Sequence, residues 1–149
     1  MELLNTPIRR LEGITYWVSE DPEGIYDFIN REIRREWEED ARFERRDPAQ
    51  DEWLTTLTKR KWRLETLDLA QINLNPDITN YVDTKRRYNF SESLAKRRKE
   101  LQESIKMYAA VIWPLVIRRE DMQLVDGYCR YDTLRAMKVS KTYAYVGSL

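Results

Sequence analysis

Residues 123–135 are the most informative part of the chain and read Gln123-Leu124-Val125-Asp126-Gly127-Tyr128-Cys129-Arg130-Tyr131-Asp132-Thr133-Leu134-Arg135. An apolar pair leads into Asp126-Gly127, and apolar residues recur with helical spacing from Tyr131 onward. This pattern predicts a strand, a tight turn at Gly127 and a helix. The first turn of such a helix presents unpaired N–H groups, and Arg130 adds further donors beside them. The sequence therefore predicts an anion site, most naturally for phosphate.

The rest of the chain predicts a mixed architecture around this turn. Alternating or apolar runs predict strands at residues 14–18, 62–69, 111–117, 122–125 and 142–146. Capping signals and apolar spacing predict three further helices, from Pro22 to about Arg45, a short one from Pro48, and one from Ser91 to about Met107. Residues 73–89 are expected to be mainly loop. Together these elements predict an α+β fold with a small mixed sheet and flanking helices.

Composition limits the chemistry that is open to this protein. Its 149 residues include 26 basic and 26 acidic side chains, so no overall positive field favours nucleic acid. Histidine is absent, which excludes a histidine general base, His-ligated zinc and every Ser-His or Cys-His nucleophile. An enzyme with this inventory must rely on carboxylates, Lys, Arg or hydroxyl groups, with or without a hard cation. Phosphoryl transfer suits that inventory, because it depends mainly on positioning and charge neutralisation.

The chain shows no sign of a membrane or secretory destination. It has no apolar run of about 18 residues and no signal peptide. Its single cysteine, Cys129, excludes an internal disulfide framework. The sequence therefore predicts a cytoplasmic protein without a membrane partner.

Five segments between Leu67 and Val146 resemble the ParB/sulfiredoxin superfamily, in the order that the family has them. They are LDLAQINLNP (67–76), ELQESI (100–105), WPLVIR (113–118), VDGYCRY (125–131) and TYAYV (142–146). They are similar, respectively, to the family's first strand with its "I-x-x-NP" turn, its "eLaeSI" helix, its "PlvVr" strand, its "DGHHR" signature and its closing "ipayV" strand. The resemblance implies a ParB/sulfiredoxin-like nucleotide-binding domain over residues 67–149. Residues 1–66 would then be a mostly helical N-terminal extension.

The resemblance also implies roles for particular residues. Gly127, Tyr128, Cys129 and Arg130 would contact the phosphates of ATP, ADP or CTP, and Asp126 would lie beside the transferred group or a Mg²⁺ ion. Glu103 and Ser104, which match the family's "ESI", could face the same phosphates. As an alternative, these two residues are only a helix-end charge and a packing hydroxyl.

Two departures from the family pattern narrow the chemistry. Sulfiredoxins carry "GGCHR" at the signature, whereas Tyr128 occupies the position of their cysteine here, so repair of sulfinic acids is not expected. Free-serine kinases of the superfamily place a catalytic Glu two residues after the Pro of the turn. That position is Ile78 in this chain, and Asp77 lies one residue earlier. Either Asp77 takes over as the base for an alcohol, or this chemistry is lost.

The leading functional hypothesis is a nucleotide-binding enzyme, either a Mg²⁺-dependent phosphotransferase acting on a small molecule or an NTP hydrolase. In it, Asp126 serves the metal or the phosphate, Asp77 is the base, Glu103 is next in line, and the extension helps to build the acceptor site. The sequence stops shortly after the last expected strand, before the helix-turn-helix and dimerisation region of ParB proteins. Site-specific DNA loading is therefore not expected.

Two alternatives stay open. One is a DNA-associated component of a partition, defence or DNA-modification system, with basic clusters at residues 85–87 and 96–99 as contacts; nucleic acid is thus a conceivable partner but not the favoured one. The other is a degenerate domain kept as an interaction module. Self-association is also open, and among the aromatic residues Tyr131 or Trp113 could stack on a base.

Overall fold

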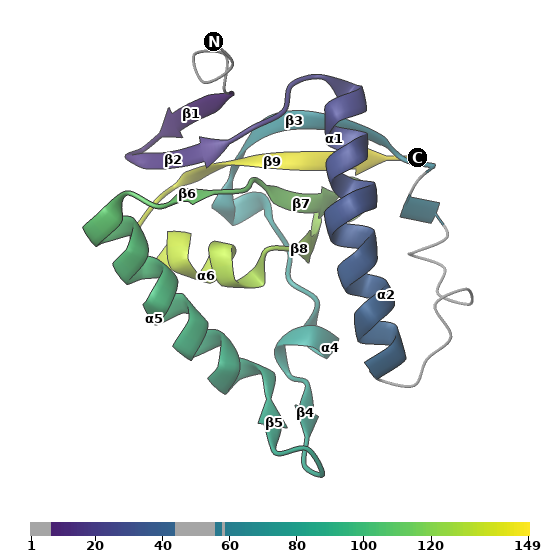
Figure 1. The fold of residues 1–149 in the computed structure, drawn as a ribbon, viewed down its shortest axis with the longest axis vertical. Coiled ribbons are helices and arrows are strands. Elements are labelled where there is room, and N and C mark those ends of the chain that lie inside the picture. Colours follow the sequence, from purple (N-terminus) through teal and green to yellow (C-terminus); the bar gives the residue numbers. More distant parts are fainter. Residues whose placement is uncertain (1–6, 44–55, 58) are drawn as a thin grey trace.

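A four-stranded mixed sheet forms the centre of the protein, whose computed structural model describes residues 7–43, 56–57 and 59–149 (Figure 1). Its strands, in spatial order, are β3 (Lys61–Asp68), β9 (Lys141–Ser148), β7 (Leu115–Arg118) and β8 (Gln123–Asp126). Strand β9 runs antiparallel to β3 and parallel to β7, and β8 is antiparallel to β7. The expected α+β fold with a small mixed sheet is confirmed.

A second, three-stranded sheet adjoins the first. It contains β1 (Ile8–Leu11), β2 (Ile14–Trp17) and β6 (Val111–Ile112), with β2 in the middle. The single strand predicted at residues 111–117 is thus two strands in two sheets. Pro114 lies between them and has no N–H to give to a ladder, so the chain leaves one sheet there and joins the other.

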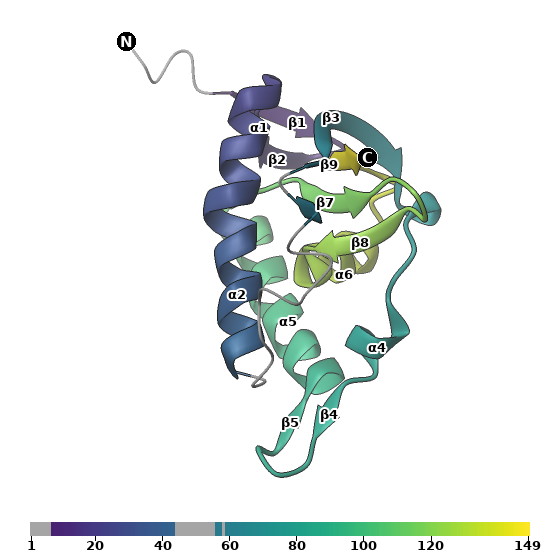
Figure 2. The ribbon, with the colours of Figure 1, turned by 90° about the vertical axis from the view of Figure 1, so that its right-hand side faces the viewer.

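Helices cover both faces of the central sheet. On one side, α1 (Pro22–Phe28), a π-helical turn (Ile29–Ile33) and α2 (Arg34–Phe43) form one continuous rod (Figure 2). Asp21 caps this rod, since its carboxylate accepts from the N–H of Glu23. On the other side lie α5 (Phe90–Tyr108) and α6 (Tyr128–Ala136). The N-cap of α5 is Asn89 and not Ser91, because the Asn89 side chain accepts from the N–H of Glu92.

Each face of the central sheet has its own apolar core, because successive side chains of a strand point to opposite faces. The face toward α5 and α6 buries Leu67, Leu115, Ile117, Leu124, Ala144 and Val146. The face toward α1 and α2 buries Trp62, Val116, Val125 and Tyr145. Burial on both faces explains why β7, β8 and β9 read as nearly continuous apolar runs in the sequence.

The boundary expected between residues 66 and 67 falls inside β3. All eight residues of that strand pair with β9, so residues 61–66 belong to the central sheet. Trp62 also packs into the core that α1 and the π-turn complete. Residues 61–66 therefore belong to the same sheet domain as the residues that follow them.

The region expected to be loop, residues 73–89, carries regular structure. It contains a short helix, α4 (Pro76–Thr79), and a hairpin of β4 (Val82–Asp83) and β5 (Tyr88–Asn89). A short 3-10 turn, Leu69–Gln71, lies just before this region. The Asp83 carboxylate accepts from the N–H groups of Lys85 and Arg86, which stabilises the turn of the hairpin. This hairpin projects from the start of α5, away from the central sheet (Figure 1). The helix predicted from Pro48 lies outside the described residues, except for a helical pair at residues 56–57.

Candidate functional site

A cavity of about 810 Å³ lies where the turn before α6 meets α4, the hairpin and α2. It brings together Asp126–Arg130, which are consecutive in the chain, and Asp77 of α4, which lies 49 residues before Asp126. The remaining lining residues come from α2, α4, the hairpin, the start of α5 and β8: Glu36, Trp37, Ile78, Tyr81, Asp83, Arg86, Tyr88, Phe90, Arg97 and Val125.

Gly127 is required at this turn for two reasons. Its φ is +107°, in the left-handed region that favours glycine. A Cβ there would lie 2.8 Å from Nη2 of Arg130 and 2.7 Å from Cδ2 of Leu115. The absent side chain thus leaves the space in which the Arg130 guanidinium lies over the turn.

Arg130 is held in place by two hydrogen bonds from one nitrogen. Its Nη2 donates to the carboxylate of Asp126 at 3.1 Å and to the carbonyl of Pro114 at 3.2 Å. The side chain is only 18% exposed, which is more buried than a cleft arginine is expected to be. Its Nε is buried without a hydrogen-bond partner, and its Nη1 makes no hydrogen bond to any residue that the structure describes. The guanidinium therefore has hydrogen-bonding capacity that the described residues around it do not use.

The first turn of α6 adds backbone donors beside this guanidinium. No side chain caps the helix, and its first internal bond runs from the N–H of Tyr131 to the carbonyl of Gly127 at 2.8 Å. Within the described ranges, the N–H groups of Tyr128, Cys129 and Arg130 have no hydrogen-bond acceptor. Such groups at the positive end of a helix dipole favour an anion.

The Tyr128 side chain does not contact the cavity's anion site in the way that the resemblance implied. Its ring is buried, its hydroxyl donates to the carbonyl of Leu124 at 3.0 Å, and that hydroxyl accepts from the N–H of Asn75 at 3.2 Å. Burial raises the pKa of this phenol. Tyr128 therefore works as a tether that fastens the Asn75-Pro76 turn to α6, and only its backbone N–H is left for a ligand.

This tether places Asp77 at the cavity. The Asn75 side chain accepts from the N–H of Asp77 at 3.0 Å and starts α4. The Asp77 carboxylate is exposed and lines the cavity, whereas Ile78 is partly buried and packs against the main core. Where the kinases named in the sequence resemblance carry their Glu, the chain thus has a partly buried apolar residue, Ile78, which lines the cavity beside the exposed Asp77.

Glu103 and Ser104 are not brought to this site. Both lie on α5, Glu103 is exposed, and neither lines the cavity. They occupy the last turns of a 19-residue helix, whereas the cavity meets that helix near its start, at Phe90 and Arg97. The spacing along the helix separates the "ESI" residues from the phosphate turn, so neither of them lines the cavity that Asp126 and Arg130 line.

The sequence interpretation missed several lining residues. Arg97 lies over the Phe90 ring at 5.9 Å, and Arg86 pairs with Asp83 at 3.7 Å, although both arginines had been read only as parts of basic clusters. A sequence signal exists for the hairpin wall of the cavity. Tyr81, Asp83, Tyr88 and Phe90 alternate with other residues around a turn-forming stretch. Residues spaced by two on a hairpin share one face.

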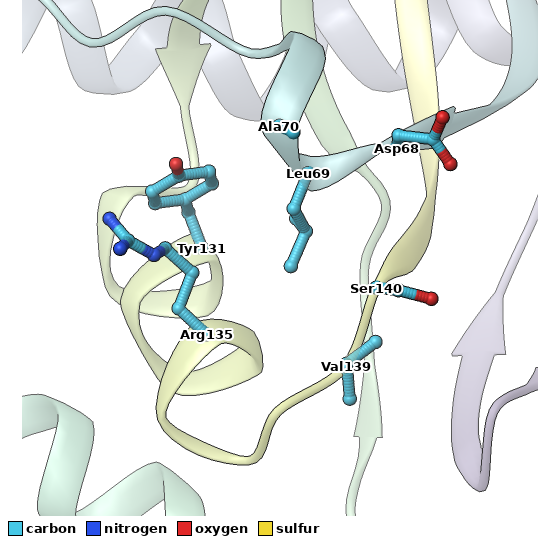
Figure 3. A pocket seen from close by; sticks show the side chains of 7 residues that line it. All are labelled: Asp68, Leu69, Ala70, Tyr131, Arg135, Val139 and Ser140. Atoms are coloured by element: carbon cyan, nitrogen blue, oxygen red, sulfur yellow. The ribbon is translucent and has the colours of Figure 1, made fainter.

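The two aromatic residues suggested for base stacking lie elsewhere. Trp113 packs on Phe28 with ring centroids 4.8 Å apart and does not line the cavity. Tyr131 is buried and lines a separate, more open hollow of about 590 Å³, where the Arg135 guanidinium lies over its ring at 5.8 Å (Figure 3). Besides these two α6 residues, the hollow is lined by Asp68, Leu69, Ala70, Val139 and Ser140, and it holds none of the residues predicted for the phosphate site.

Asp126 fits the metal role only together with a ligand. Among the described residues, no group of three or more His, Cys, Asp or Glu side chains could hold a metal ion. Mg²⁺ in phosphate-handling sites, however, takes one or two carboxylates and completes its shell with water and phosphate oxygens. Asp126 on the cavity wall, with Asp77 across the same space, suits that arrangement.

Comparison with known proteins gave matches among solved structures. No protein-family model matches the sequence, and none of the curated proteins matches it. The chain is similar to a structure described as the C2221 form of a Pnob8-like ParB-N domain, with 16% identity, a TM-score of 0.44, and coverage of 62% of this chain and 31% of that chain. A second pNOB8-like ParB N-domain gives 15% identity, a TM-score of 0.42, and coverage of 60% and 29%. The chain thus spans about a third of the length of these structures.

Proposed function

We propose that this protein binds a nucleotide with its phosphates at the first turn of α6, and that it is a Mg²⁺-dependent phosphotransferase or NTP hydrolase. One observation carries the proposal. Arg130 is fixed over Gly127 with unused donors, beside three unpaired backbone N–H groups, in a cavity that is also lined by Asp77, Asp83 and Asp126. Phosphate is the ligand that best fits a guanidinium and a helix N-terminus acting together.

Each side chain has a defined role in this proposal. Arg130 and the N–H groups of Tyr128, Cys129 and Arg130 bind phosphate oxygens, and Arg86 and Arg97 supply further positive charge in the same cavity. When bound, Mg²⁺ neutralises charge on the phosphates, and Asp126 is the protein ligand nearest to the phosphate turn. Asp77 takes the proton of the acceptor, which is an alcohol in a phosphotransferase and water in a hydrolase.

The N-terminal segment belongs to the acceptor side of the site. Glu36 and Trp37 of α2 line the same cavity as the phosphate turn. Because α2 is continuous with the helix packed on the central sheet, this wall is positioned by the second apolar core. A small acceptor would thus lie between α2 and α4, within reach of Asp77.

Isothermal titration calorimetry with ATP, ADP and CTP in the presence of Mg²⁺ tests the binding step. At least one nucleotide is expected to bind, and Arg130→Ala should weaken it about ten- to a hundredfold, the size of a lost charge-assisted hydrogen bond. Arg130→Lys keeps the positive charge but loses the planar array of guanidinium donors, so its nucleotide affinity should lie between those of the wild type and Arg130→Ala. Release of inorganic phosphate, followed with and without candidate alcohols, separates hydrolysis from transfer.

Arg135→Ala is the matched control. Arg135 lies on the same helix as Arg130, is exposed, and lines only the separate hollow. Its loss should leave nucleotide affinity unchanged. The absence of binding by any of the three nucleotides at millimolar concentration would refute the proposal, as would equal losses in the two alanine variants.

The alternative of a DNA-associated component rests on the two basic clusters. In the cluster at 96–99, Arg97 lies over Phe90 and Arg98 pairs with Asp132 at 3.1 Å, which leaves Lys96 and Lys99 as its exposed cations without a described partner. A gel shift with duplex DNA at rising salt tests this alternative, because phosphate contacts weaken steeply as salt rises.

In the described part of the chain, no helix combines the length and the apolar character needed to cross a membrane.

A further inference from the structure

The β4–β5 hairpin presents an aromatic face to the cavity. Asp83 pairs with Tyr88 across the hairpin, and the N–H of Phe90 bonds to the carbonyl of Tyr81 at 3.0 Å. These two cross-strand pairs are spaced by two residues, so all four side chains lie on one face. All four line the cavity, whereas Val82, on the opposite face, is 53% exposed and does not.

Two of the aromatic rings are in contact and still open to solvent. The centroids of Tyr81 and Tyr88 lie 5.9 Å apart at an interplanar angle of 51°, and the side chains are 36% and 37% exposed. Neither ring belongs to one of the two apolar cores. Exposed aromatic rings held together in a cavity offer a platform for a planar ligand group.

The aromatic face adjoins the phosphate turn. Phe90, next to the two tyrosines, meets the ring of Tyr128 edge-on at 5.8 Å, and Tyr128 is the first residue of α6. The Arg97 guanidinium lies over the Phe90 ring. The phosphate turn of α6 and the aromatic face of the hairpin therefore adjoin in one cavity, joined by the contact between the rings of Phe90 and Tyr128.

We infer that Tyr81 and Tyr88 bind the base of the nucleotide, so the site selects nucleotides over phosphate chains that lack a ring. This inference rests on the proposed function, which supplies the phosphate end. It gives the hairpin a role that is separate from phosphate binding, because the rings of Tyr81 and Tyr88 contact the base and not the phosphates. Stacking tolerates any base, so the hairpin favours a base over none and does not choose between adenine and cytosine.

Calorimetry with ATP, CTP and sodium tripolyphosphate, all with Mg²⁺, tests the inference. The wild-type protein should bind a nucleotide at least about tenfold more tightly than tripolyphosphate. Tyr81→Ala and Tyr88→Ala should each weaken nucleotide binding about five- to a hundredfold and leave tripolyphosphate affinity unchanged. Tyr81→Phe and Tyr88→Phe keep the rings and should behave like wild type. Tyr26→Ala is the control, since Tyr26 is an exposed tyrosine on α1 outside the cavity.

The outcomes separate the inference from the proposed function. Equal wild-type affinity for nucleotide and tripolyphosphate overturns the base platform and leaves the phosphate site standing, even if the alanine variants fail to fold. Loss of tripolyphosphate binding in the tyrosine variants as well, with melting temperatures unchanged, also overturns it. If neither nucleotides nor tripolyphosphate bind to the wild type, the proposed function fails and the inference fails with it.

Discussion

Asp126→Asn is the most informative single change, because Asp126 pairs with the arginine that we assign to phosphate. The carboxylate oxygen lies 3.1 Å from Nη2 of Arg130, and the two side chains are 21% and 18% exposed. Asparagine keeps the size and a carbonyl oxygen that can accept the same hydrogen bond, but it removes the charge. The change should therefore keep Arg130 over Gly127 and release its guanidinium from a competing anion.

The magnitude follows from the environment of the pair. Two unit charges 3.1 Å apart attract each other by about 5 kcal/mol at an effective dielectric constant of 20, before any cost of desolvation. Exposed pairs retain ~0.2–1 kcal/mol, and breaking a fully buried pair costs ~3–5 kcal/mol. A pair that is about four-fifths buried lies between these limits, at about 1.5–2 kcal/mol. An anion that has to displace Asp126 should thus bind about 10- to 30-fold more tightly to Asp126→Asn when Mg²⁺ is absent.

Titration of nucleotide in EDTA and in excess Mg²⁺ measures the nucleotide affinity without and with the cation. The variant should bind more tightly than wild type in EDTA, gain less from Mg²⁺, and show lower turnover. Asp132→Asn is the matched control, since Asp132 is also on α6 and pairs with Arg98 at 3.1 Å, but lies outside the cavity. Weaker binding of Asp126→Asn in EDTA would contradict the reasoning, because Asp126 would then support the ligand site and not compete for it.

Three further changes test the base and the packing. Asp77→Asn should keep nucleotide affinity and lower turnover by about 10²–10⁴, the usual contribution of a general base; a variant as fast as wild type excludes Asp77 from that role. Gly147→Ala should lower the free energy of unfolding by about 1–3 kcal/mol in urea melts, because the new Cβ would lie 2.7 Å from the ring of Trp62; an unchanged midpoint would contradict this packing. Tyr16 is buried against Thr142, and burial raises the pKa of its phenol to about 12. The unfolded chain ionises near pH 10 and the folded one later, so stability should fall between about pH 10 and 12, and Tyr16→Phe should fall less steeply there.

Local signals in the sequence were sufficient for most of the fold. Asp21-Pro22 marks the start of the first helix, since both the cap and the fixed φ of proline act within one turn. Strand β8, the turn at Gly127 and α6 follow from a change in apolar period within a few residues. Pro114 is visible in the sequence, and its lack of an N–H allows the chain to change sheets there.

The cavity could be predicted only in part, because its other walls depend on distant contacts. The sequence places Asp126 and Arg130 four residues apart, but it does not show that they pair and so bury the arginine. Tyr128 was expected to touch phosphate, and its hydroxyl instead holds Asn75, 53 residues away. No local pattern reports that bond.

The geometry of Asp126 and Arg130 also bears on how a cation and a phosphate would enter the site. A cation that arrives alone must take Asp126 from Arg130 and leave the guanidinium, already carrying a buried Nε without a partner, with no anion. A phosphate that arrives alone meets an arginine whose charge Asp126 offsets. When the two arrive together, Asp126 turns to the cation and Arg130 to the phosphate, so both charges stay paired in a partly buried site. On the proposed function, the pair therefore favours joint binding of cation and phosphate over binding of either one alone.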